Sequence, residues 1–364
     1  MRKIALLAAA LLTVGTLFGC AAPKTRPVAI DPQRRAQEET LERKLVLERQ
    51  LRDQARIDRV AWPILLHATS LCGDHLAPEL GVQFAVVSGF NKDFRAAAVD
   101  LLGLSDEPTL ISVIPGSPAD SAGLKPGDVI RALGGVAAPT GDKATEKLHK
   151  ELEAQIKRDG HIAFLIRRNG AEQTVDVRPD VICNYRVLLG PSDEINAFAD
   201  GEKIVVQKGM LRFVETDVEL ATVVGHELAH NTMGHMNAKK TNYMLGSIFD
   251  IALAVAGVNT QGAFGNAAAG AYSKEFEAEA DYVGLYALAL ADISVDESAY
   301  FWRRMAAEAS ANVTTKYNST HPGSADRYLA LEAAAKEIHA KQAAGEPLQP
   351  NLKKVAKKVA PKNM

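Results

Sequence analysis

The pattern of hydrophobic and polar positions changes its period twice along the chain. Residues 33–60 are dense in Arg, Glu and Gln, with apolar side chains recurring among them at helical spacing. A narrow apolar stripe with opposite charges three or four positions apart predicts a charged N-terminal helix over residues 33–70. The helix either packs on the body of the protein or pairs as a short coiled coil, but we favour a solvated helical spacer.

Between residues 78 and 180 the pattern changes to short runs typical of β-strands, separated by Pro-Gly turns. The runs cover residues 82–87, 110–114, 129–133, 162–166 and 174–177. One helical stretch, residues 143–157, lies between the third and fourth runs. This order predicts a β-rich α+β domain over residues 78–180.

Helical spacing returns in the second half, where we predict a mainly α-helical domain over residues 183–342. Thr216 and Glu219 form a capping box that starts a long helix. The apolar run at 245–258 is shorter than the ~20 residues needed to span a membrane, so we expect a buried helix or a mobile lid there.

The first twenty residues carry a targeting signal. Two basic residues precede an apolar run at 4–18, and the Cys20 that follows completes a sequence that resembles a bacterial lipobox. The resemblance implies a lipoprotein signal peptide over residues 1–19, lipid on Cys20 and a proline-containing tether over residues 20–32. An ordinary cleaved signal with an incidental cysteine is the alternative.

Composition, charge and the residue after Cys20 indicate how many domains the chain contains, which class of partner it lacks and where it is located. With 364 residues, 47% of them hydrophobic and 24% charged, the chain fits two folded domains with connecting pieces. The balance of 42 basic and 44 acidic residues argues against a nucleic-acid partner. Ala21, rather than an aspartate, follows Cys20 directly. This resembles the pattern of lipoproteins that Gram-negative bacteria send to the outer membrane, so we expect a periplasmic protein anchored to that membrane. The lysine-rich residues 343–364 are expected to form a basic disordered tail.

Candidate chemistry lies on two predicted helices. His226 and His230 are four positions apart in a His-Glu-x-x-His motif, which places both imidazoles on one helix face where they can bind one metal ion. Glu227 beside them can accept a proton from water. On the second helix, Glu277 and Asp281 supply a third ligand and a carboxylate that can hold a ligand histidine. An acidic, solvated helix start is the alternative for the second helix.

Two neighbouring residues are left out of this predicted site. Glu279 suits a solvated acidic helix start, where carboxylates interact favourably with the helix dipole. His235 follows His230 by five positions and falls off the ligand face of a continuous helix, so we expect a structural role.

The β-rich domain contains the string SPADSAGLKPGD at residues 117–128, which resembles PDZ domains of the bacterial, HtrA-like kind. The resemblance implies binding of peptide C-termini by strand addition, with the carboxylate loop and accepting strand at Leu80, Gly81 and Val82. An unusual insert at 85–109 follows this strand, so a structural spacer without a working groove is the alternative.

Cys72 and Cys183 lie just outside the two ends of the PDZ-like domain. Because the ends of a PDZ domain emerge near each other, the resemblance implies that these cysteines can form a disulfide. Burial as two free thiols is the alternative.

Several motifs in the second half occur in one order between residues 183 and 340. They are NAFADG at 196–201, the run at 204–206, the two metal motifs, FWRRM at 301–305, and His321-Pro322 followed by Arg327. Together they resemble HtpX-like, CAAX-prenyl-protease-type zinc metallopeptidases, and a lipobox-bearing, periplasmic subset is most similar. The resemblance implies a helical zincin (gluzincin) domain with a small edge sheet.

The same resemblance implies roles for individual residues. One Zn²⁺ per chain would be held by His226, His230 and Glu277, with Glu227 as general base and Asp281 behind the ligands. Arg327 and His321 are candidates for stabilising the oxyanion, or they order the loop before the last helix, and His321 is also a candidate for capping the zinc. An extended substrate would lie along an edge strand formed by Ile204, Val205 and Val206.

We therefore expect a membrane-anchored, zinc-dependent endopeptidase of the cell envelope that acts on misfolded or mislocalised envelope proteins. The competing hypothesis is a latent or non-catalytic periplasmic chaperone or scaffold, which binds unfolded or C-terminal peptide segments through its PDZ domain.

Overall fold

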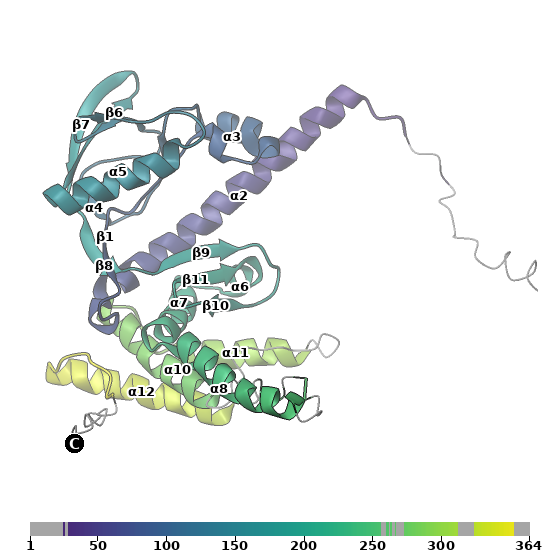
Figure 1. Ribbon diagram of the computed structural model, residues 1–364, viewed down its shortest axis with the longest axis vertical. Helices are drawn as coiled ribbons and strands as arrows, with labels where there is room; N and C mark the ends of the chain where they lie inside the picture. Colours follow the sequence, from purple (N-terminus) through teal and green to yellow (C-terminus); the bar gives the residue numbers. More distant parts are fainter. Residues whose placement is uncertain are drawn as a thin grey trace, which may run out of the picture. The chain divides into compact units, whose positions relative to one another are not determined.

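The computed structural model describes residues 28–255, 273–311 and 324–352, together with residues 25, 260, 261, 263 and 266. The predicted signal peptide, Cys20 and His321 lie outside the described residues, as does the chain from residue 353. The chain divides into two compact units, residues 1–42 and 43–364. The boundary falls within α2 (Pro32–His67), the long purple helix of Figure 1.

The second half of α2 belongs to the hydrophobic core. Its buried side chains are Ile57, Val60, Ala61, Trp62, Ile64 and Leu65, and Leu47 is buried earlier in the helix. From Ile57 onward they join the large cluster that also contains residues of the helical domain. The solvated spacer that we favoured is therefore wrong for this half of the helix, because its apolar face packs on the protein body.

All five predicted β-runs form strands of one antiparallel sheet with the order β2-β3-β4-β6-β7. The strands are β2 (Val82–Ala85), β3 (Thr109–Val113), β4 (Val129–Leu133), β6 (Ile162–Arg168) and β7 (Ala171–Val177), with β5 (Val136–Ala137) paired to β4. Helix α5 (Ala144–Asp159) adds Leu148 to a core that contains Leu110, Leu133 and Phe164. The insert after β2 contains the short helix α3 (Arg95–Leu102), and α4 (Pro118–Ser121) follows β3.

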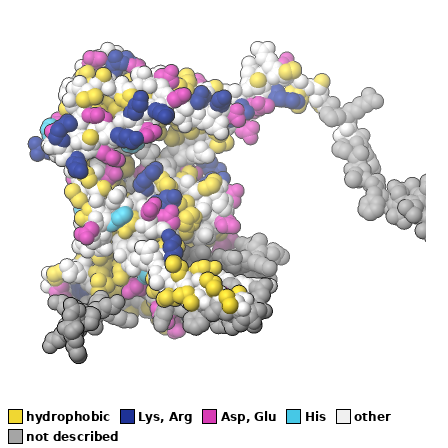
Figure 2. Space-filling model, viewed as in Figure 1, with side chains coloured by type: hydrophobic (Ala, Val, Ile, Leu, Met, Phe, Trp, Pro, Cys, Tyr) yellow, Lys and Arg dark blue, Asp and Glu magenta, His cyan; other side chains and the backbone are white. Residues whose placement is uncertain are grey.

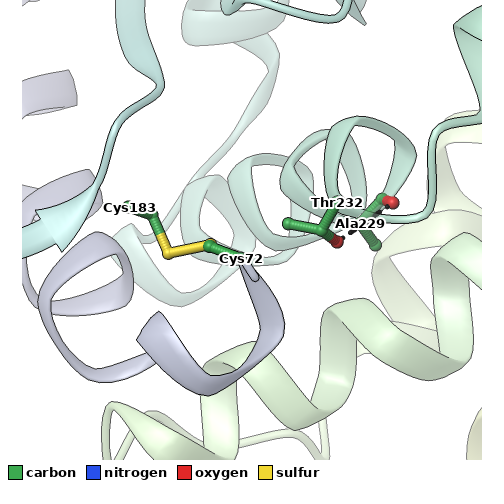
Figure 3. Close-up of a disulfide and its surroundings, with 4 residues drawn as sticks. All are labelled: Cys72, Cys183, Ala229 and Thr232. Carbon is green, nitrogen blue, oxygen red and sulfur yellow. Dashed lines mark hydrogen bonds between the residues drawn. A yellow bond between two sulfur atoms is a disulfide. The ribbon is translucent and has the colours of Figure 1, made fainter. Parts of the chain in front are cut away.

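The two ends of this domain are joined twice. Strand β1 (Leu76–Glu79) pairs antiparallel with β8 (Asp180–Cys183). Cys72 and Cys183 form a disulfide with a Cα–Cα distance of 5.7 Å (Figure 3). Both cysteines are buried, and Leu71 beside them packs against a small cluster of the helical domain formed by Ala229, Ala280 and Val283. The junction is therefore fixed by a covalent bond, a strand pair and core contacts.

The helical domain opens with a three-stranded sheet of order β10-β11-β9. Strand β11 (Lys203–Gln207) lies in its centre, parallel to β9 (Arg186–Gly190) and antiparallel to β10 (Ala197–Ala199). The prediction that Ile204, Val205 and Val206 form an edge strand is therefore wrong. All three side chains are buried, which is what three consecutive apolar positions in a strand covered on both faces require.

The edges of this sheet differ. Along β9, Gln54 of α2 accepts a hydrogen bond from the Leu189 amide at 2.8 Å and donates one to the Val187 carbonyl at 2.9 Å. The Gln54 side chain therefore forms hydrogen bonds with the backbone groups of β9 to which an additional strand would have to bind. At the opposite edge, β10 pairs with no second strand among the described residues, and its Phe198 is exposed.

Helices form the rest of the domain (Figure 1). They are α6 (Lys208–Phe213), α7 (Asp217–Thr232), α8 (His235–Val255), α10 (Ser273–Leu290), α11 (Ser298–Ala311) and α12 (Ala325–Ala344). Within the described range, residues 219–231 of α7 are buried on every side. Such a helix lies inside a domain rather than at its surface.

The described part of the 245–258 run is not the buried helix that we expected. Leu245, Ile248, Ile251 and Val255 on α8 are exposed, and Figure 2 shows a cluster of hydrophobic side chains over this helix. Among the described residues, no helix has the length and hydropathy needed to cross a membrane.

The prediction of a disordered tail from residue 343 onward is wrong for residues 343–352. Helix α12 continues to Ala344, and the segment after it is held in place. The Asn351 amide donates to Tyr282 at 3.0 Å, and its side chain donates to Glu337 at 2.9 Å. Residues up to 352 therefore belong to the folded domain.

Candidate metal centre

The start of α7 is fixed by its own side chains. Thr216 Oγ1 accepts from the Glu219 amide at 3.1 Å, and Glu219 accepts from the Glu215 amide at 2.6 Å. These contacts satisfy amides that have no partner inside the helix. Arg304 of α11 pairs with the buried Glu219, so the helix start is also tied to the surrounding helices.

Three side chains converge between α7 and α10. The Nε2 atoms of His226 and His230 lie 3.1 Å apart. Glu277 Oε2 lies 3.3 Å from the His226 nitrogen, and Glu277 Oε1 lies 3.4 Å from the His230 nitrogen. All three are buried, and within the described part of the chain they form a group able to hold a metal ion. Two imidazoles and a carboxylate are the donor set of a catalytic zinc site, so the residues fit zinc.

The close approach of the two helices depends on glycines. A Cβ added to Gly284 of α10 would lie 3.0 Å from the carbonyl carbon and oxygen of Gly225 and from the His226 amide nitrogen. A Cβ on Gly225 would in turn meet Leu288 at 2.4 Å. The two glycines therefore allow the backbones of α7 and α10 to touch beside a ligand histidine.

A carboxylate and an arginine lie behind His226. Asp281 Oδ1 is 2.9 Å from His226 Nδ1, the nitrogen that faces away from the other ligands. Arg327 donates to both Asp281 oxygens, at 2.6 and 2.8 Å, and its guanidinium lies 4.1 Å from the centre of the Trp302 ring. Asp281 therefore orients the ligand, and Arg327 orients Asp281.

The charges of the site follow from burial and these contacts. Burial opposes ionisation of both Asp281 and His226, but the Asp281 contacts with His226 and Arg327 keep the pKa of Asp281 below its usual range. Asp281 and Glu277 raise the pKa of His226 to about 9, against the effect of burial. Burial lowers the pKa of His230 to about 4. At neutral pH the imidazole ring of His226 in the metal-free protein therefore carries both of its protons and a positive charge, while the ring of His230 is neutral.

Comparison with known families agrees with this geometry. Residues 184–335 match the sequence model of Peptidase family M48, and residues 78–178 match that of the PDZ domain. The chain carries an M48 peptidase domain and a PDZ domain.

Curated relatives match each domain separately. The mitochondrial metalloendopeptidase OMA1 of Schizosaccharomyces pombe is 30% identical over 154 residues, which are 40% of this chain and 45% of that protein. OMA1 of Saccharomyces cerevisiae is 31% identical over 153 residues, covering 39% and 44%. The serine protease HTRA1 of Xenopus laevis is 27% identical over 104 residues, covering 28% and 21%. The chain thus spans less than half the length of these relatives.

The M48 domain brings most of the predicted site residues together. Glu227 is buried on α7 between the two histidines, as its place in the motif requires. Arg327, predicted to face either the oxyanion or a loop, is directed at Asp281 by its Nε and Nη2 atoms. The role of His321 lies outside the described residues.

Sequence reasoning missed other residues of the M48 site. His235, expected to be only structural, lies with Nδ1 2.9 Å from Nδ1 of His230. Asn231 accepts from the Gly201 amide at 2.8 Å and donates to the Lys203 carbonyl at 3.2 Å, which ties the β10–β11 turn to α7. The only sequence signal for this role of Asn231 was its position directly after His230.

In the PDZ domain, the predicted carboxylate loop precedes an edge strand. Leu80 is buried, and Gly81 has φ +75°, a conformation that favours glycine. A Cβ on Gly81 would also lie 2.3 Å from that of Ser117, so the loop has no room for a larger residue. Val82 begins β2, the edge strand of the sheet.

Proposed function

We propose that this protein is a zinc-dependent endopeptidase of the cell envelope, tethered to the outer membrane by lipid on Cys20. The observation that carries the catalytic part is the buried set of His226, His230 and Glu277 with Glu227 between the histidines. Burying two imidazoles and two carboxylates side by side has a high energetic cost, which packing alone does not offset.

The chemistry follows from this donor set. When bound, zinc supplies Lewis acidity, which polarises a carbonyl group and acidifies water. Glu227 acts as general base, because its carboxylate takes a proton from the attacking water and returns it to the leaving amine. Asp281 and Arg327 hold His226 in the orientation that the site needs.

The substrate would pair with β10 rather than with β11. An extended peptide adds to a free strand edge through backbone hydrogen bonds, and residues 197–199 supply that edge. The Asn231 contacts hold this strand's turn against α7, one residue from the ligand His230. An unfolded segment of a misfolded or mislocalised envelope protein offers the extended backbone that such pairing requires.

The test compares casein cleavage by wild type and Glu227→Gln, both loaded with zinc. Removing the general base should lower kcat by about 100-fold or more. Glu275→Gln is the matched control, since Glu275 is exposed at the start of α10. Equal rates for wild type and Glu227→Gln would refute the mechanism, and binding of unfolded casein without cleavage would favour the scaffold hypothesis.

Two further parts of the proposal have their own tests. The PDZ domain would bind peptide C-termini, so a peptide with a free carboxylate should bind more tightly than its amide. Equal binding of the two would argue for a structural spacer. Lipid anchoring predicts that Cys20→Ala releases the protein from membranes, and continued membrane association would contradict it.

A further inference from the structure

We infer that His235 and Glu279 act together as positioning residues for the metal ligand His230. This inference rests on the proposed metal site. His235 is the first residue of α8 and is 1% exposed. Gly234, at φ +68°, ends the preceding turn and folds His235 back toward α7. Its ring is then enclosed between the ligand helix and α10.

Both ring nitrogens of His235 have defined neighbours. Nδ1 lies 2.9 Å from Nδ1 of His230, and Nε2 lies 2.9 Å from Glu279 Oε2. One ring face stacks on Phe276 with the centroids 4.6 Å apart. Phe276 and Glu279 flank Glu277 on α10, so the helix that provides the third ligand also holds His235.

Proton positions along this chain of contacts follow from donor and acceptor counting. His230 directs Nε2 at the other ligands, so a neutral, metal-binding ring carries its proton on Nδ1. That proton is donated to Nδ1 of His235, which must then be the unprotonated nitrogen. The proton of His235 is consequently on Nε2 and is donated to the Glu279 carboxylate. The carboxylate thus sets the direction of both hydrogen bonds.

Glu279 acts through His235 because of its place on the helix. It is two residues after Glu277, about 200° around the helix axis, and so points away from the ligand face. Its side chain is 44% exposed, whereas that of His235 is 1% exposed. His235 spans the distance between this carboxylate at the rim and the buried ligand. Asp281 contacts His226 directly, so each ligand histidine has a partner behind it.

Metal affinity tests the inference without relying on activity. Partners of this kind typically contribute 10–100-fold to metal affinity. His235→Phe keeps an aromatic ring against Phe276 but removes the acceptor, and it should weaken zinc binding by about 10-fold or more. His235→Gln offers a carbonyl oxygen to His230 and should recover part of this loss. Zinc dissociation constants are measured by chelator competition, with Glu275→Gln as the exposed control on α10.

A double-mutant comparison separates positioning from simple packing. Once His235→Phe has removed the link, Glu279→Ala should cause no further loss of affinity, whereas alone it should weaken zinc binding. Zinc affinity of His235→Phe within twofold of wild type overturns the inference, as do additive losses in the double variant. Failure of wild type itself to bind zinc would instead overturn the proposed metal site. Far-UV circular dichroism and melting of the metal-free variants check the fold, and His235→Gln serves if His235→Phe does not fold.

Discussion

Replacement of Gly284 by alanine tests whether helix contact holds the metal centre together. The added Cβ would lie 3.0 Å from backbone atoms of Gly225 and His226. A real Cβ rarely makes contacts this short, so α10 and α7 must move apart by a few tenths of an ångström. Metal–ligand distances tolerate shifts of only about 0.2 Å. Since Glu277 is on α10 and the histidines are on α7, this displacement should separate the ligands.

The expected effects on stability and on metal binding differ. Overpacking costs about 1–3 kcal/mol, while alanine is favoured over glycine in a helix by about 1 kcal/mol. The free energy of unfolding should therefore fall by only about 0–2 kcal/mol. Zinc affinity should fall by about 10-fold or more, the typical effect of misplacing a ligand's support.

Chelator competition and urea unfolding of the metal-free protein measure the two quantities separately. Gly89→Ala is the control, because its added Cβ would meet only a Val86 methyl group at 3.9 Å. Wild-type zinc affinity in Gly284→Ala would refute the argument that backbone contact sets the ligand spacing. If zinc affinity were unchanged but stability fell strongly, the added Cβ would be accommodated by movements that leave the metal ligands in place.

Three further predictions follow from other contacts. Replacing Cys72 and Cys183 by alanine should lower the free energy of unfolding by about 5 kcal/mol in the chain-entropy model, since the bond spans 111 residues; equal urea midpoints with and without reductant would contradict this. Burial raises the pKa of Asp58 from 3.8 to about 6, so the wild type loses stability as pH rises from 3.8 to about 6, by at most about 3 kcal/mol. Asp58→Asn should therefore gain stability relative to wild type between pH 4.5 and pH 8, and a pH-independent difference in urea unfolding would be the opposing result. Arg327→Lys keeps the charge but loses the two-point contact with Asp281, so zinc affinity should fall by about 10-fold in chelator competition; an unchanged value would leave Arg327 without a positioning role.

The ligand set could be predicted from sequence because it depends on local geometry. Positions four apart share a helix face, so His226 and His230 had to lie together once α7 was recognised. The same argument placed Glu277 and Asp281 on one face of α10. The strands of the PDZ domain were also predictable, since short apolar runs separated by turns carry their own signal.

Packing partners were harder to predict. The polar first half of α2 suggested a spacer, although the apolar run from Val60 to Leu65 indicated burial. Likewise, three consecutive buried positions at 204–206 fit a central strand better than an edge. Which element covers an apolar face depends on residues far away in the chain, and periodicity carries no information about them.

The contact between His235 and His230 was missed because the sequence was interpreted as one continuous helix through both residues. On a continuous helix, a residue five positions after His230 lies about 140° away from it, which excludes contact with the ligand. In the structure α7 ends at Thr232 and a second helix, α8, begins at His235. The angle between positions of one helix therefore does not describe this pair of residues. Gly234 was the signal, because glycine in a left-handed conformation commonly ends a helix.

One helix pair carries nearly all of the metal centre. Helix α7 supplies both histidines and Glu227, while α10 supplies Glu277 and the carboxylates behind each histidine. Because the ligands come from two helices, zinc binding would favour their packing, and metal affinity and folding stability should change together. Leu71, next to the disulfide, packs against the cluster formed by Ala229 of α7 and by Ala280 and Val283 of α10. The junction with the PDZ domain therefore supports the same helix pair, so loss of the disulfide should weaken zinc binding as well as the fold.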